Sequence, residues 1–152
     1  MSDYLLVSDY ASLADYPLFS DLTTEQLQKI LYICTEESFL PGAELHKAGD
    51  VAENVFFILN GTVEEELHVG DVILSTYKTL SDGDVTGCSA ILPPVEHTCT
   101  ARAITETNVL SIDAEGLRKL FDEDCTLARS LLLQVISALH QRIRTLELGQ
   151  NA

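Results

Sequence analysis

The histidines and cysteines are the residues of this chain whose chemistry could support a metal site or a nucleophile. His46, His68 and His97 lie scattered over the middle of the chain, without the close His-x-His pair and following Glu that metal sites in β-rolls use. The chain has no Cys-x-x-Cys, no Gly-x-Ser-x-Gly and no Walker loop. We therefore expect no bound metal and no catalytic residue, and the chain is not predicted to be an enzyme.

The charge of the chain limits its partners. Its 152 residues include 9 basic and 24 acidic side chains, a net charge of −15. Such a field repels nucleic-acid phosphates and anionic lipid, so we expect no nucleic-acid and no membrane partner. No apolar run reaches the roughly 18 residues of a membrane span, and Asp3 and Asp9 stand where a signal peptide would be basic. We expect a cytoplasmic protein with four reduced, mostly buried cysteines: Cys34, Cys88, Cys99 and Cys125.

The apolar pattern changes twice along the chain and divides a single domain, residues 1–152, into three segments. Residues 1–34 have a helical pattern. Residues 35–113 contain seven or eight short apolar or alternating runs, separated by glycine turns such as Asn60-Gly61. Residues 114–148 return to a helical period. The order indicates an α+β, mainly β fold: an antiparallel eight-stranded β-roll (jelly roll) flanked by N-terminal helices and a C-terminal helix pair.

The helices can be bounded from their caps and apolar spacing. One helix is predicted from a threonine cap over residues 24–34, a short one over 114–121 and a long one over about 125–148. The first two-thirds of the chain also contains three segments in a characteristic order: a Pro-Leu-Phe-Ser-Asp-Leu entry at residues 17–22 and two glycine-containing segments at 48–63 and 80–87. Together they resemble the cyclic nucleotide-binding domain family, which bacterial catabolite-activator-type regulators, kinase regulatory subunits and cyclic-nucleotide-gated channels share.

Residues 87–100 correspond in that family to the phosphate-binding cassette. The resemblance implies one helical turn whose N–H groups point at a cyclic phosphate. It also implies a glutamate for the ribose hydroxyl and an arginine that pairs with the phosphate oxygens. In this chain Cys88 stands at the glutamate position and His97 at the arginine position. The candidate ligand-binding residues are those of the cassette frame: Gly87, Cys88, Ser89, Ala90, Ile91, Leu92, His97 and Thr98.

Both replacements weaken the expected ligand chemistry. A thiol is a weak acceptor, and an imidazole that is mostly neutral near pH 7 lacks the five-donor fork of arginine. Arg102 lies five residues beyond His97, and strand alternation predicts that it points elsewhere. Charge-assisted bonds contribute roughly 1.5–3 kcal/mol each. The affinity for a cyclic nucleotide should therefore be about three or more orders of magnitude lower than with the glutamate and arginine in place.

Two functions remain open at this point. The first is a non-catalytic regulatory module that senses a cyclic nucleotide (cAMP or cGMP), or another small molecule, in an altered cassette. The second is a pure protein–protein interaction module with a vestigial pocket. Cassette side chains folded into the pocket would favour interaction, and an open cavity would favour sensing. Cys88 at the start of the cassette turn also raises the possibility of a redox-sensitive thiol.

The last predicted helix carries a heptad pattern: Leu132, Ile136, Leu139, Ile143 and Leu146. Ile at a and Leu at d favour a parallel two-stranded coil. In the resembled bacterial regulators this helix is the dimer axis, so the resemblance implies a homodimer through it. Arg142 and Glu147 flank the seam and are predicted to pair across the dimer. The alternative is that the stripe packs on the β-roll of its own chain. A second apolar face would allow the helix to make both contacts: Leu131, Leu133 and Val135.

Overall fold

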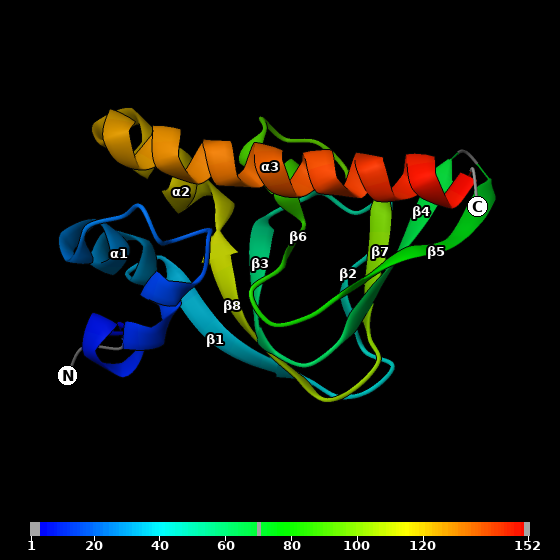
Figure 1. The fold of residues 1–152 in the computed structure, drawn as a ribbon, viewed down its shortest axis with the longest axis horizontal. Helices are drawn as coiled ribbons and strands as arrows, with labels where there is room; N and C mark the ends of the chain where they lie inside the picture. The colour runs from blue at the N-terminus through cyan, green and yellow to red at the C-terminus, as the bar shows by residue number, and fades with distance from the viewer. Residues whose placement is uncertain (1–3, 70, 151–152) are drawn as a thin grey trace.

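Two antiparallel sheets of four strands each form the centre of the fold (Figure 1). The structure is a computed structural model that describes residues 4–69 and 71–150, without the side chains of residues 69, 73–78 and 145–150. The first sheet has the order β1 (Cys34–Phe39), β8 (Thr107–Asp113), β3 (Asn54–Asn60), β6 (Val85–Thr86). The second has the order β2 (Glu44–His46), β7 (Cys99–Ala103), β4 (Val63–Val69), β5 (Val72–Leu80). The predicted α+β fold with an eight-stranded antiparallel β-roll is confirmed.

The turn between β3 and β4 depends on a glycine. Gly61 has a φ of 116°, and a Cβ there would lie 2.7 Å from the Cα of Thr107. Any side chain would therefore collide with the start of β8, which explains why the turn predicted at Asn60-Gly61 needs glycine. Strand β3 pairs with β8 in an antiparallel register that places Phe57 opposite Leu110.

Strand β3 has buried side chains on both of its faces. Phe57 and Ile58 are both fully buried, although they point to opposite faces. Phe57 contacts Phe19 of the N-terminal segment, with ring centroids 4.9 Å apart. Ile58 packs with Val63 of the second sheet in a separate hydrophobic cluster. One face of the first sheet is thus covered by helical segments and the other by the second sheet, as a two-layer fold requires.

The N-terminal helices are shorter than the sequence predicts. Two 3₁₀ turns, η1 (Val7–Asp9) and η2 (Ala11–Asp15), precede α1 (Thr24–Leu31). A capping box starts α1: Gln26 N–H donates to the Thr23 hydroxyl over 3.1 Å, and the Gln26 side chain accepts from Thr23 N–H over 2.9 Å. The helix ends at Leu31 rather than near residue 34, because Cys34 already pairs with Ile112 as the first residue of β1.

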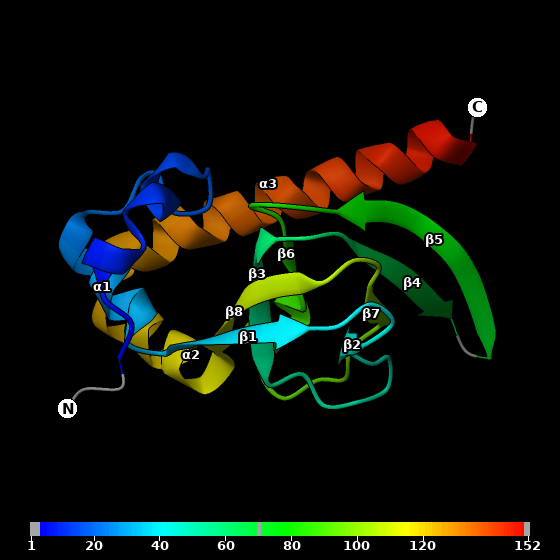
Figure 2. The same cartoon turned by 90° about the horizontal axis from the view of Figure 1, so that it is seen from below.

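The C-terminal helices lie against one end of the β-roll (Figures 1 and 2). Helix α2 spans Ala114–Glu123 and α3 spans Cys125–Gln150, each about two residues longer than predicted. Asp113 accepts a hydrogen bond from Gly116 N–H over 2.9 Å and starts α2, whereas Asp124 accepts from Leu127 N–H over 3.0 Å and starts α3. These two caps explain why one helical stretch divides into two helices.

No described helix combines the length and the apolar character needed to span a membrane.

Candidate ligand-binding site

The cassette begins at a backbone turn that requires glycine. Strand β6 ends at Thr86, and Gly87 follows with a φ of 80°. A Cβ at Gly87 would lie 2.9 Å from the carbonyl oxygen of Asn54, so both the conformation and the space favour glycine. The 3₁₀ turn η3 (Cys88–Ile91) comes next. The structure therefore forms the single helical turn that the resemblance implied for this segment.

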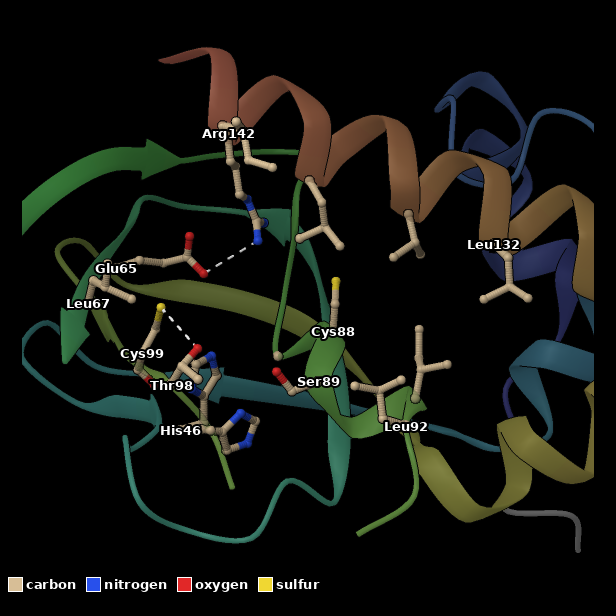
Figure 3. A pocket seen from close by; sticks show the side chains of 16 residues that line it. His46, Glu65, Leu67, Cys88, Ser89, Leu92, Thr98, Cys99, Leu132 and Arg142 are labelled. Atoms are coloured by element: carbon tan, nitrogen blue, oxygen red, sulfur yellow. Dashed lines mark hydrogen bonds and ion pairs between the residues drawn. The ribbon is translucent and has the colours of Figure 1, made fainter. Parts of the chain in front are cut away.

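A cavity of about 450 Å³ lies between this turn, strands of the second sheet and α3 (Figure 3). Seven of the eight predicted ligand-binding residues line it: Gly87, Cys88, Ser89, Ile91, Leu92, His97 and Thr98. Ala90 is the exception, because its side chain is fully buried in the core beneath the turn. Leu92 lines the cavity and is 55% exposed.

His97 is part of the cavity wall and not a solvated loop residue. It is 7% exposed, and its ring stacks on that of His46 with centroids 4.1 Å apart. Burial lowers the pKa of His46 to about 4, with a further lowering by His97. Burial also lowers the pKa of His97. The position that carries an arginine in the resembled family thus holds an imidazole that is neutral near pH 7.

Both ring nitrogens of His46 lie within hydrogen-bonding distance of a partner. Nδ1 lies 2.9 Å from the carbonyl oxygen of Cys99, which can only accept, so Nδ1 donates. Nε2 lies 2.8 Å from the hydroxyl oxygen of Thr86. The same hydroxyl oxygen lies 2.7 Å from Glu65 Oε2. Because the neutral ring with a proton on Nδ1 has an acceptor at Nε2, the single Thr86 proton is donated either to His46 Nε2 or to Glu65 Oε2. Thr86 therefore links the stacked histidines to a carboxylate on the opposite wall.

Cys88 is a neutral thiol rather than an activated one. Burial raises its pKa to about 11, although the charge of Arg142 acts in the opposite direction. A cysteine that reacts with oxidants at neutral pH needs a lowered pKa, whereas the pKa of Cys88 is raised. Among the described residues, no three histidine, cysteine, aspartate or glutamate side chains are grouped so that they could hold a metal ion.

An ion pair closes the cavity on the side of α3 (Figure 3). Arg142 Nη1 lies 3.7 Å from Glu65 Oε2, and Nη2 donates to the carbonyl oxygen of Val85. Glu65 is 2% exposed and Arg142 is 8% exposed. The helix turns the Arg142 side chain towards the β-roll, so the prediction that it pairs with Glu147 across a dimer is wrong.

Arg102 does not replace the missing cassette arginine. It pairs with Glu66, and its Nη2 lies 3.6 Å from Glu44 Oε2. These groups are on the other face of β4 and β7 from the cavity, because side chains alternate along a strand. The prediction that Arg102 points away from His97 agrees with this placement.

The described residues of the predicted dimer helix overlap in their placement, because Leu139 and Ile143 line the cavity and are also exposed. Leu132, Leu139 and Ile143 line the cavity on the underside of α3, whereas Ile136 does not. Ile136, Leu139 and Ile143 are 59%, 39% and 54% exposed. The side chain of Leu146 lies outside the described residues. Of the second apolar face, Leu131 and Val135 are buried, but Leu133 is 52% exposed and does not belong to the core.

The fold and the cassette define a class of protein, and comparison with known proteins gives its family. The model of the cyclic nucleotide-binding domain family matches residues 36–124, which is more than half of the chain. The chain therefore belongs to the cyclic nucleotide-binding domain family. The matched range includes the whole cassette and helix α2.

Individual relatives agree with this assignment. A protein from Geobacter metallireducens, named as a cyclic nucleotide-binding protein, is 30% identical, and the match covers 88% of this chain and 96% of that chain with a TM-score of 0.76. A cyclic nucleotide-binding domain from Methylobacillus flagellatus is 17% identical with a TM-score of 0.76 over 91% of this chain and 80% of that chain, which shows the fold alone. A protein of Rhodopseudomonas palustris named as a potassium channel protein is 29% identical over 82% of this chain. The chain spans 30% of that protein's length.

Proposed function

We propose that this chain is a non-catalytic regulatory module that binds a small molecule in the cassette cavity and has a low affinity for cyclic nucleotides. The observation that carries the proposal is the pair of neutral side chains, Cys88 and His97, on the wall of an open cavity of about 450 Å³. The cavity supports sensing, because a cassette that had only a structural role would not need to keep this space. The family of the chain supports a regulatory role.

Low affinity for a cyclic nucleotide follows from the groups that its phosphate would meet. His97 offers a neutral ring, and Cys88 offers a thiol in place of a ribose acceptor. Arg142 is the cation of the described cavity wall, but Glu65 already pairs with it. A phosphate entering this site would therefore lose its hydration without gaining a free cation in return.

Calorimetric titration with cAMP and cGMP at low salt tests the proposal. The unmodified chain should give no measurable heat at micromolar ligand. The double variant Cys88→Glu, His97→Arg restores the two family groups, so it should bind cyclic nucleotides about a thousandfold more tightly than the unmodified chain. A matched control is Cys125→Glu, since Cys125 is exposed and remote from the cavity.

Micromolar binding of cAMP or cGMP by the unmodified chain would overturn the proposal. It would show that the cavity recognises a cyclic phosphate without the two family side chains. Heat from the double variant alone would support a cavity that has kept its shape.

A second copy of this chain is the partner that we propose for the exposed face of α3. Three apolar side chains on this helix are exposed in the single chain: Ile136, Leu139 and Ile143. Their spacing matches the a and d positions of a two-stranded coil, which buries such side chains against an identical helix. The competing function, a pure interaction module, would use the same face to bind a different protein.

A further inference from the structure

We infer that the ligand of the cassette cavity is an uncharged, largely apolar small molecule that hydrogen-bonds to Ser89. This inference rests on the proposed function and names the ligand class for the same site. The proposed function states only that cyclic nucleotides bind weakly, whereas this inference states which class of ligand the cavity binds.

The walls of the cavity are mostly apolar. Leu67 of β4 and Ile91 of the cassette face Leu132, Val135 and Leu139 of α3 across the space. Burying apolar ligand surface against such side chains contributes about 25 cal/mol per Å² removed from water. A volume of about 450 Å³ is within the range of small-molecule sites, which typically combine apolar walls with a few placed polar groups.

The described charges of the cavity cancel one another. Among the residues that the structure describes, the ionised side chains in the wall are Glu65 and Arg142, and they pair over 3.7 Å. The histidines of the wall, His46 and His97, have lowered pKa values because they are buried. An anion that drew Arg142 away from Glu65, or a cation that drew Glu65 away from Arg142, would break this pair. Either ligand would leave one buried charge without its partner, which is costly.

The polar group that is suited to orient such a ligand is the hydroxyl of Ser89. It lines the cavity and points into the space between the cassette and the second sheet (Figure 3). A hydroxyl can donate or accept, so it accommodates an uncharged carbonyl, ether or hydroxyl of the ligand. The ring nitrogens of His46 are less available, because both already have hydrogen-bonding partners.

Two fluorescent probes that differ by a single charged group test the ligand class. N-phenyl-1-naphthylamine is neutral, and 8-anilinonaphthalene-1-sulfonate has the same ring frame with an added sulfonate. The unmodified chain should bind the neutral probe saturably, with one probe per chain and an affinity about tenfold or more above that for the sulfonate. Equal affinities, or tighter binding of the sulfonate, would overturn the inference.

Two variants of α3 locate the bound probe. Leu139→Asp places a charge in the cavity wall and should weaken the neutral probe about tenfold or more. Leu133→Asp changes a leucine on the same helix that is 52% exposed and outside the cavity, and it should change the affinity less than about twofold. An equal loss in both variants would mean that the probe binds the exposed helix surface, and the inference would fail.

The ion pair provides a third and independent variant. Glu65→Gln keeps the shape of the side chain but leaves Arg142 without its carboxylate partner. The ratio of neutral to sulfonate affinity should then fall by about tenfold, because the cavity acquires an uncompensated cation. An unchanged ratio, in a variant whose circular dichroism spectrum matches that of the parent, would contradict the role assigned to the pair.

The probe experiments and the nucleotide titration can fail separately. If the neutral probe does not bind and the chain still gives no heat with cAMP, the ligand class is wrong and low nucleotide affinity stands. If cAMP binds at micromolar concentration, the proposed function itself is wrong, whatever the probes do.

Discussion

His46 is a buried histidine that both stacks on another ring and has hydrogen-bonding partners at its two nitrogens. Its ring stacks on His97, and its nitrogens contact the carbonyl of Cys99 and the hydroxyl of Thr86. Burial, the neighbouring His97 and the charge of Arg142 disfavour the protonated ring, while the Cys99 carbonyl favours it. Because the pKa falls to about 4 in the folded chain, the neutral ring is the form that the fold stabilises.

This lowered pKa predicts loss of stability in acid. Below about pH 6.5 the unfolded chain binds a proton at His46 that the folded chain does not bind until about pH 4. The free energy of unfolding should therefore fall as the pH falls from 6.5 to 4, by up to about 3 kcal/mol from this residue. Urea unfolding across this range, compared with the variant His46→Gln, measures the contribution. A pH dependence that is identical in the two proteins would contradict it.

The candidate site was only partly predictable from single residues. Cys88 and His97 could be assigned to the site because the cassette is continuous in sequence. Glu65 could not be assigned, although strand alternation does separate it from Glu64 and Glu66 and places it on the inner face. Arg142 was assigned to the wrong surface, because its direction depends on how α3 crosses the β-roll, and no local pattern specifies that crossing.

Among the elements, α2 and the cassette are connected by hydrogen bonds from Arg118. Arg118 of α2 donates through Nη1 to the carbonyl oxygen of Ala90 over 2.7 Å and to that of Leu92 over 3.2 Å. Both acceptors lie at the C-terminal end of the η3 turn. Movement of the turn would therefore change the contacts of α2, and movement of α2 would change those of the turn.

Removing this link should loosen the cassette. Arg118→Ala eliminates hydrogen bonds from a charged donor, so we expect a loss of about 1.5–3 kcal/mol in the free energy of unfolding. Amide exchange at Ala90 and Leu92 should also accelerate. The matched control is Lys119→Ala. Its side chain is 72% exposed and pairs with Glu115 on the helix surface, so its removal should cost less than about 1 kcal/mol. Equal effects of the two variants on exchange at the cassette would refute the link.

The elements themselves were largely predictable. The strands follow from short apolar runs between glycine turns, because glycine provides the positive φ that Gly61 and Gly87 require. Helix ends were less predictable. Helix α1 stops at Leu31 because Cys34 is recruited into β1 by pairing with β8, a contact across almost 80 residues that no local signal contains.

For the whole molecule, the exposed face of α3 predicts a dimer that depends on concentration. Ile136 is 59% exposed and outside the cavity, so Ile136→Asp should weaken self-association without changing the cavity wall. Sedimentation velocity should show a dimer for the parent chain and a monomer for this variant at the same concentration. Ser137→Asp, an exposed change on the adjacent face of the helix, is the control and should remain dimeric. A monomeric parent chain at all concentrations would contradict the proposed homodimer.

Helix α3 is a single 26-residue rod that starts at its Asp124 cap and passes over the cavity. At 1.5 Å per residue it is about 39 Å long. A rotation of about 10° at the capped end would carry its far end through about 7 Å. The helix therefore acts mechanically as a lever, in which a small change of tilt near the core becomes a large displacement at the other end of the molecule.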